Sequence, residues 1–291
     1  MKNWFKIRAA DFIEFNPRLS IKKGALATKV AMDKLQPFTK KIPSTEQAEF
    51  SGGSKFCNKD TIMARITPCL ENGKTAFVDI LADNEVAFGS TEFIVLRARD
   101  GVSDPQFIYY LATSPAFRNV AIKSMVGSSG RQRVQQSVLD ELELTVPSLP
   151  EQQRISAFLA VLDAKIAQNN EINDNLYAQA RAITNQWIVE NEDDYDLLPL
   201  EEIAAINPDT YSPKDEWEYV NYLDTSSIID GCISDIQHII PASEKLPSRA
   251  RRIVAPNDVV FSTVRPNQRH FGIISMPLPN MLASTGFAVI R

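Results

Sequence analysis

The stretch Ser148-Leu149-Pro150-Glu151 opens the longest helical pattern in this 291-residue chain. Its Ser-x-x-Glu spacing is typical of a capping box, and proline is tolerated in the first turn of a helix. From Ile155 to Trp187 apolar side chains then recur at alternating spacings of four and three, which is the pattern of one helix face. No glycine or proline interrupts the pattern. It predicts a helix from about residue 151 to 190, roughly 60 Å long at about 1.5 Å per residue.

The apolar face of this helix has a polar centre, because Asn169 and Asn173 occupy its middle positions. A buried asparagine at such a seam can fix register and partner choice at some cost in stability. The stripe is also longer than a neighbouring domain could cover, which favours a spacer helix over one lying on its own domain. The predicted helix-pairing residues are Ile155, Leu159, Leu162, Ile166, Asn169, Asn173, Leu176 and Ile183.

The segments on either side of the helix resemble each other. Asn16-Pro17 recurs as Asn207-Pro208, residues 59–68 align with 257–266, and residues 88–97 align with 282–291, all in the same order. The second copy stops at the equivalent of Arg97. We therefore expect a first domain at residues 1–147, a spacer helix at 148–190 and a partial second copy at 191–291.

Within the first segment the patterns predict an α+β fold. Residues 75–80, 86–88, 92–97 and 142–146 are typical of strands, and residues 105–124 of a helix. No alternation of strand and helix suggests a nucleotide-binding sheet.

Charge is unevenly distributed along the chain. The net charge is −5, which at first argues against nucleic acid, because phosphate neutralisation needs clustered Lys and Arg. However, residues 1–150 hold 20 Lys and Arg against 16 Asp and Glu, whereas the remainder holds 11 against 20. Only the first segment is basic.

Targeting and metal signals are missing from the sequence. It shows no signal peptide and no apolar run long enough to cross a membrane. Three widely spaced cysteines form no C-x-x-C pair, and neither histidine has metal-ligand neighbours. We expect a cytoplasmic protein without a structural metal.

A search for catalytic motifs favours a protein that performs no chemistry. Gly73-Lys74-Thr75 lacks the first glycine of a phosphate loop, and both Asn-Pro turns lack the second proline and aromatic residue of adenine methyltransferases. No nuclease arrangement or Ser-His-Asp set is visible.

One loop is suited to a polyanion. Residues 125–133, Met-Val-Gly-Ser-Ser-Gly-Arg-Gln-Arg, combine glycines and hydroxyls with two arginines. Arginine can bind phosphate or guanine, and glutamine can pair with adenine. An ordinary turn whose arginines form surface ion pairs explains the same residues equally well.

Taken together, these elements resemble the specificity subunit of type I restriction–modification systems. The pieces that carry the resemblance are residues 51–53, 60–68, 90–93 and 127–133, and above all the Pro-Glu-Gln-x-x-Ile of residues 150–155 continuing into Leu162-Asp163-Ala164-Lys165-Ile166. In that family two target recognition domains alternate with helical regions. Each domain reads half of a bipartite DNA site, and the antiparallel helices set the distance between the halves.

The resemblance implies double-stranded DNA as ligand, and methylation subunits and a restriction/translocase subunit as partners. S-adenosylmethionine would then sit on the methylation subunit, leaving this chain without a cofactor, and the spacer helix could also form a homodimer. We predict DNA contacts from Lys55, Arg65, Lys74, Ser128, Arg131, Gln132 and Arg133. Two alternatives stay open: a coiled-coil assembly or dimerising half-subunit with weak or lost DNA specificity, and, less well supported, a self-contained nuclease or methyltransferase.

Overall fold

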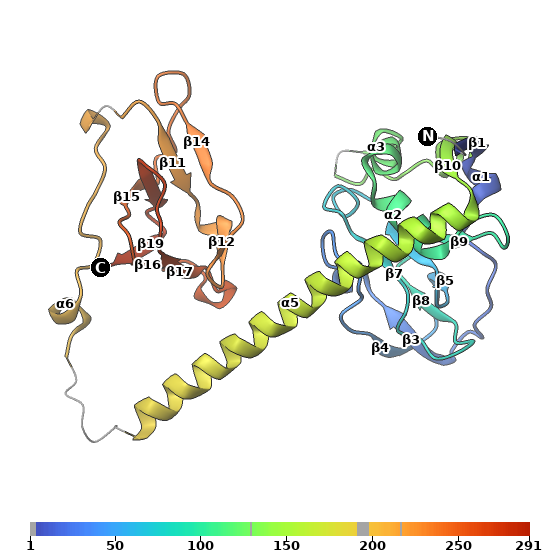
Figure 1. The fold of residues 1–291 in the computed structure, drawn as a ribbon, viewed down its shortest axis with the longest axis horizontal. Helices are drawn as coiled ribbons and strands as arrows, with labels where there is room; N and C mark the ends of the chain where they lie inside the picture. Colours follow the sequence, from blue (N-terminus) through green and yellow to red (C-terminus); the bar gives the residue numbers. More distant parts are fainter. Residues whose placement is uncertain (1–3, 129, 191–197, 216) are drawn as a thin grey trace. The chain divides into compact units, whose positions relative to one another are not determined.

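A computed structural model describes residues 4–128, 130–190, 198–215 and 217–291 (Figure 1). The chain divides into two compact units, Met1–Ile183 and Thr184–Arg291. Both units are built on small β-sheets, and helices are concentrated in the first. The predicted α+β class is confirmed.

Two four-stranded sheets form the first unit. One has the order β2 (Ile13–Phe15), β9 (Phe93–Ala98), β6 (Thr61–Ala64), β7 (Thr75–Phe77), and the other the order β4 (Glu46–Glu49), β3 (Leu26–Val30), β8 (Ala87–Gly89), β5 (Ser54–Phe56). All neighbours pair antiparallel except β3 and β8. A further pair, β1 (Trp4–Arg8) with β10 (Glu143–Pro147), brings the start of the unit beside its last strand.

Strand β9 shows how the core is divided between the two faces of its sheet. Ile94 and Leu96 pack into one buried cluster, and Phe93 and Val95 into the other, as the two-residue period of a strand requires. The first cluster also takes in the helices that cover this face, α1 (Ala9–Phe12), α2 (Pro105–Thr113), α3 (Pro115–Lys123) and α4 (Gln136–Asp140). A short 3-10 turn, η1 (Met32–Lys34), lies in the loop after β3.

The single helix predicted for residues 105–124 is wrong, because the chain breaks between α2 and α3. Ser114 is extended, with φ −67° and ψ 150°, and Pro115 occupies the first turn of the new helix. Proline disfavours helical geometry in the residue before it, so the first helix ends there.

The long helix is confirmed as α5 (Leu149–Glu190), 42 residues in length. Its first turns are fixed to the first unit by Gln152, which is fully buried. The Gln152 amide nitrogen donates to the carbonyls of Val102 and Pro147 at 3.2 and 2.9 Å, and its oxygen accepts from the Asp104 amide at 2.9 Å. One turn later the Ser156 hydroxyl donates to the Asp104 carboxylate at 2.7 Å.

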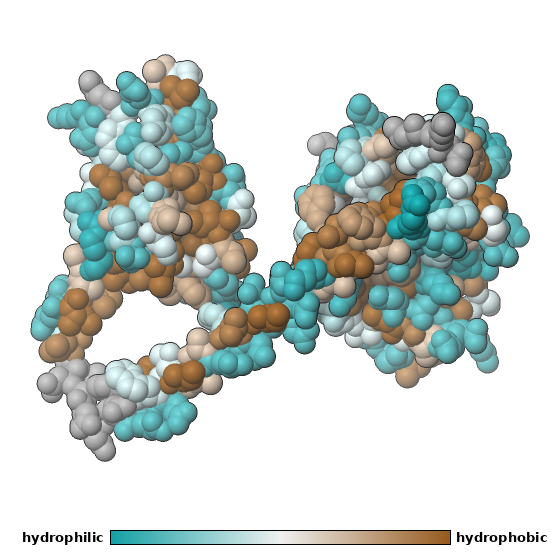
Figure 2. Space-filling view, viewed as in Figure 1, coloured by the Kyte–Doolittle hydropathy of each residue, from teal (hydrophilic) through white to brown (hydrophobic). Residues whose placement is uncertain are grey.

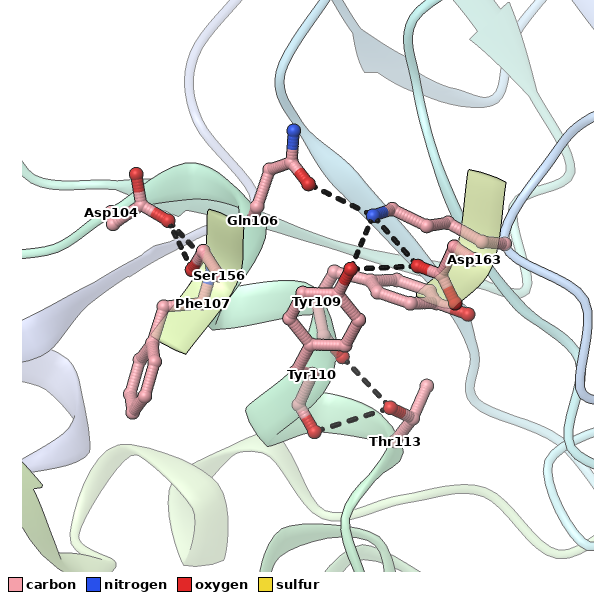
Figure 3. A network of polar contacts seen from close by, with 9 residues as sticks. Asp104, Gln106, Phe107, Tyr109, Tyr110, Thr113, Ser156 and Asp163 are labelled. Carbon is pink, nitrogen blue, oxygen red and sulfur yellow. Dashed lines mark hydrogen bonds and ion pairs between the residues drawn. The ribbon is translucent and has the colours of Figure 1, made fainter. Parts of the chain in front are cut away.

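A second anchor holds α5 at Asp163 (Figure 3). The Lys40 ammonium donates to Asp163, to the Tyr110 hydroxyl and to Gln106, at 3.0, 2.8 and 2.9 Å, and lies 4.5 Å from the centre of the Tyr110 ring. The Tyr110 hydroxyl itself donates to Asp163 at 2.6 Å. Burial and this carboxylate both raise the pKa of Tyr110 above its usual range. The network joins the loop after β3 to α2 and to the helix.

The predicted pairing stripe divides at this anchor. Ile155 packs against the core of the first unit, and Leu159 is half-buried. Beyond them, Leu162, Ile166, Leu176 and Ile183 are 47% to 67% exposed, and Asn169 and Asn173 are also exposed. Figure 2 shows apolar side chains along this part of the helix.

The second unit repeats the sheets of the first. It contains a short helix, α6 (Leu200–Ile203), and a sheet of order β14 (Gln237–Ile239), β11 (Val220–Leu223), β18 (Met281–Ser284), β15 (Ala250–Ile253). Another sheet has the order β17 (Phe271–Ile274), β16 (Asp258–Ser262), β19 (Phe287–Ile290), and β12 (Ile228–Ile229) forms a hairpin with β13 (Cys232–Ile233). Strands β11 and β18 are parallel, as β3 and β8 are in the first unit.

Matching backbone contacts confirm the internal repeat. Asn16 and Asn207 are both left-handed, with φ 48° and 53°. Each side-chain oxygen accepts a hydrogen bond from the backbone amide of a valine, Val95 on β9 or Val289 on β19, at 3.0 Å.

An ion pair between an arginine and a buried aspartate also occurs in both copies. Arg97 donates to both oxygens of Asp60 at 2.7 Å, and Arg291 donates to those of Asp258 at 2.8 and 2.9 Å. Both aspartates are buried.

Replacing Asp60 by Ala should lower the free energy of unfolding of the first unit by about 3 kcal/mol, because Arg97 is left without its counter-charge. Hydrogen exchange of the β6 and β9 amides would measure the loss. Asp258→Ala is the matched control and should affect only β16 and β19. Equal loss of protection in both units for either variant would contradict this expectation.

Candidate nucleic-acid interface

A hollow of about 340 Å³ lies beside the Asn16-Pro17 turn of the first unit. Its lining contains three cations, Arg18, Lys55 and Arg65, and no acidic residue. The rest of the lining is formed by Asn16, Pro17, Leu19, Gly53, Ser54, Thr91, Phe93 and Val95. The positive charge of this lining favours binding of an anion.

The conformation of Asn16 sets the direction of the backbone along the wall of this hollow. The left-handed conformation it adopts is one that asparagine tolerates better than most residues. Its amide donates to the Val95 carbonyl at 2.7 Å, and its side chain donates to Gln136 at 2.7 Å. The turn thus ends β2 and carries Pro17, Arg18 and Leu19 along the wall of the hollow.

Lys55 and Arg65 reach the hollow from two different sheets. Lys55 lies on β5, and its ammonium is 5.1 Å from the centre of the Phe50 ring. Arg65 follows β6 directly: its amide donates to the Glu92 carbonyl at 2.8 Å, and its own carbonyl accepts from Val134 at 2.8 Å. The Arg65 Nε is buried and has no hydrogen-bond partner among the residues that the structure describes.

The loop that the sequence singled out lies directly against Arg65. Val126 and Arg133 exchange backbone hydrogen bonds at 3.0 and 2.9 Å, and the Gln132 carbonyl accepts from the Thr67 amide at 3.0 Å. Gly127 has φ 141°, and a Cβ atom there would lie 2.9 Å from the Arg131 carbonyl, so glycine is needed. Ser128 and Arg131 are exposed and Gln132 is half-buried, while Ser129 lies outside the described residues.

Arg133 forms a surface ion pair. It donates to both oxygens of Glu92 at 2.7 to 3.1 Å. Hydrogen bonding from Arg133 is the main cause that lowers the pKa of Glu92, against the opposing effect of burial, and the charge of Arg65 contributes. For Arg133 the structure therefore favours the ion-pair interpretation of the loop, whereas no ion pair engages Arg131 in the described part of the chain.

Of the predicted residues, Lys55 and Arg65 share the hollow, and the loop of Ser128, Arg131, Gln132 and Arg133 adjoins it through Arg65. Lys74 does not line the hollow: its ammonium donates to the Met32 carbonyl at 3.0 Å. The sequence reasoning missed Arg18, although it lies next to the Asn-Pro turn that the repeat had marked. The repeated Asn-Pro turn was the sequence feature that could have identified Arg18, which directly follows it.

A second hollow, of about 400 Å³, shares Gly53 and Thr91 with the first. It includes Glu49, and its one lysine, Lys29, pairs with Glu46 at 2.7 Å. Positive and negative side chains therefore balance more nearly in the second hollow than in the first, which holds three cations and no acid.

The described residues contain no group of three or more His, Cys, Asp and Glu side chains placed to hold a metal ion. Nor does any of the helices found there have the length and apolar character needed to cross a membrane.

Comparison with known proteins points to one family. The family model described as the type I restriction modification DNA specificity domain matches residues 1–178. Over 104 residues the chain is 34% identical to the type I restriction enzyme EcoAI specificity subunit of Escherichia coli, covering 36% of this chain and 18% of that protein. Over 134 residues it is 31% identical to the HindI specificity subunit of Haemophilus influenzae, covering 45% of this chain and 28% of that one. The matches thus span less than a third of these relatives.

Among solved structures, the HsdS subunit from Thermoanaerobacter tengcongensis aligns over 100% of this chain and 75% of its own, with 18% identity and a TM-score of 0.47. The type I restriction-modification S subunit from M. genitalium aligns over 99% and 72%, with 17% identity and a TM-score of 0.49.

The Glu92–Arg133 contact should make the loop sensitive to acid. Because the folded pKa of Glu92 is lowered, its stabilisation is complete above the unfolded value of about 4.3 and is lost as the pH falls through the folded value. Backbone NMR signals of Val126 and Arg133 should therefore shift on acidification. In Glu92→Gln this dependence should disappear, while Glu71→Gln, at an exposed position, should keep it. An unchanged titration in Glu92→Gln would exclude the contact as its cause.

Proposed function

The chain belongs to the type I restriction–modification DNA specificity family, and from this premise we propose that it recognises the DNA sequence on which such a complex acts. The observation that carries the proposal is the basic hollow in the first unit, the part that the family model matches. Arg18, Lys55 and Arg65 line it without an ion pair to any described residue. Phosphate contacts from such side chains supply affinity for DNA, and base contacts supply specificity.

We assign base reading to the loop beside the hollow. Arg131 is exposed and has the donors to bind guanine, and Gln132 has the groups to pair with adenine. The Ser128 hydroxyl can form a hydrogen bond with either base. Arg133, which is held by Glu92, and Lys74, which is held by Met32, would support the surface more than contact a base.

The chemistry in this proposal belongs to partner subunits. Methylation subunits would bind S-adenosylmethionine and modify adenine, and a restriction/translocase subunit would move and cut DNA. The specificity chain would contribute no catalytic group of its own. The complex would act in the cytoplasm, where its DNA is.

The exposed length of α5 is the surface we assign to helix pairing. Four large apolar side chains, Leu162, Ile166, Leu176 and Ile183, lie on one face around Asn169 and Asn173. An exposed apolar stripe of this kind is typical of an interaction site. Its occupant would be a helix of a methylation subunit or, in a homodimer, the same helix of a second copy.

The proposal is tested by expressing the chain with a type I methylation subunit of the same organism and mapping which adenines become methylated. A bipartite motif would support two reading units, and a palindrome would support a dimer of first units. Methylation without a sequence motif would contradict DNA recognition and favour the assembly protein instead.

Replacing both Arg131 and Gln132 by Ala should relax discrimination at one or two base pairs, at about 1–3 kcal/mol for each lost bidentate contact. Sequencing of methylated sites would show a degenerate position in the motif. Lys123→Ala, an exposed change on α3, should leave the motif intact. An unaltered motif in the double variant would remove these residues from the reading surface.

Leu176→Asp should disrupt pairing of α5, because a carboxylate in an apolar seam would be buried without a partner. Light scattering of the chain alone, and co-purification with the methylation subunit, would measure the loss. Gln168→Asp, at an exposed position off the seam, is the matched control. If both variants assemble as the unaltered chain does, α5 is not the pairing surface.

A further inference from the structure

The internal repeat allows the hollow to be compared with the same place in the second unit. Asn207 occupies the position of Asn16, as their matching contacts with Val289 and Val95 establish. Thr263 occupies that of Arg65, because its amide donates to the Gly286 carbonyl at 2.9 Å as that of Arg65 donates to Glu92 at 2.8 Å. Strand β15 pairs with β18 as β5 pairs with β8.

All three cations of the hollow are replaced in the second unit. Arg18, Lys55 and Arg65 correspond to Asp209, Ile253 and Thr263, and Ser54 corresponds to Arg252. Asp209 pairs with Arg291 at 2.7 Å. The same backbone arrangement therefore forms without the three cations, so the fold does not require them.

Holding these cations together has an electrostatic cost. Like charges in one concavity repel, and the cost rises where water is partly excluded. No ion pair joins Arg18, Lys55 or Arg65 to another described residue, and Glu92, on whose carboxylate the charge of Arg65 acts, is hydrogen-bonded by Arg133. A buried guanidinium nitrogen of Arg65 has no acceptor in the described part of the chain, and the same is true of Arg252 in the second unit, so the three cations without ion pairs are what distinguish the first unit. An anionic ligand would relieve the repulsion between these cations and would accept a hydrogen bond from Arg65.

We infer that the hollow of the first unit binds one phosphate of the DNA backbone through Arg18, Lys55 and Arg65, an assignment that rests on the proposed function. Arginine offers a planar fork and lysine a point charge, and both recognise phosphate. The hydroxyls of Ser54 and Thr91, which also line the hollow, are further donors. The bound phosphate fixes the register of the duplex, and the adjoining loop with Arg131 and Gln132 reads the bases.

The test uses the full chain and a fluorescein-labelled duplex of mixed sequence, with affinity measured over a range of KCl concentrations. In the double variant Lys55→Ile, Arg65→Thr, which installs the second unit's residues, binding should weaken about tenfold. The slope of log K against log salt should become less steep by about 1, the value for one neutralised phosphate. Arg65→Lys should retain the slope, and Lys123→Thr on α3 should change nothing.

The other outcomes distinguish failure of the proposed function from failure of the phosphate site alone. If the unaltered chain binds no duplex, the proposed function fails together with the inference. If it binds but the double variant keeps the full salt slope, only the phosphate site is wrong. A double variant that keeps the slope but prefers different sequences would assign the hollow to base reading. Competition by inorganic phosphate beyond that of KCl at equal ionic strength, lost in the double variant, would show a site for free phosphate instead.

Discussion

The buried ion pair between Asp60 and Arg97 is the contact on which the first unit is organised. Asp60 directly precedes β6 and also accepts a hydrogen bond from the Cys57 amide at 2.8 Å, while Arg97 lies near the end of β9. Since β6 and β9 run antiparallel, this pair fixes their register at one end of the sheet. The opposite ends of the same strands hold Arg65 and Glu92, which belong to the candidate interface. The structural ion pair of Asp60 with Arg97 and the candidate interface at Arg65 and Glu92 thus lie at opposite ends of β6 and β9.

Much of the fold was predictable wherever its cause is local in sequence. The helix α5 follows from an uninterrupted apolar period, and the repeat is visible because the Asn-Pro turn needs a residue that tolerates a positive φ. The helix predicted for residues 105–124 failed at Pro115, whose effect on Ser114 is also local and was overlooked. The order of the strands could not be predicted from the sequence, because the parallel pairing of β3 with β8 joins segments separated by a long stretch of chain.

The residue types of the candidate site were predictable, but the hydrogen-bond and ion-pair partners of their side chains were not. Lys55 and Arg65 were identified from the sequence, yet nothing there shows that they remain unpaired. The partner of Arg133 is an acid 41 residues away, and that of Lys74 is a backbone carbonyl, which leaves no trace in a pattern of side chains. The repeat did not by itself identify Arg18, because the two copies share the Asn-Pro turn and differ at the next residue, which is Arg18 in one and Asp209 in the other.

The difference between the copies explains how such a fold can vary its ligand surface. Both retain the buried carboxylate with its arginine and the left-handed asparagine, contacts whose loss would leave buried charges and donors unsatisfied. Position 18 and its equivalent can instead be arginine or aspartate, because their side chains lie at the surface beyond the ends of the shared strands. In the first unit the anchors at Gln152 and Asp163 tie the start of α5 to the same body, so the interface and this part of the helix are held in one rigid frame. A substitution in the hollow can therefore change what the unit binds without changing where its helix begins.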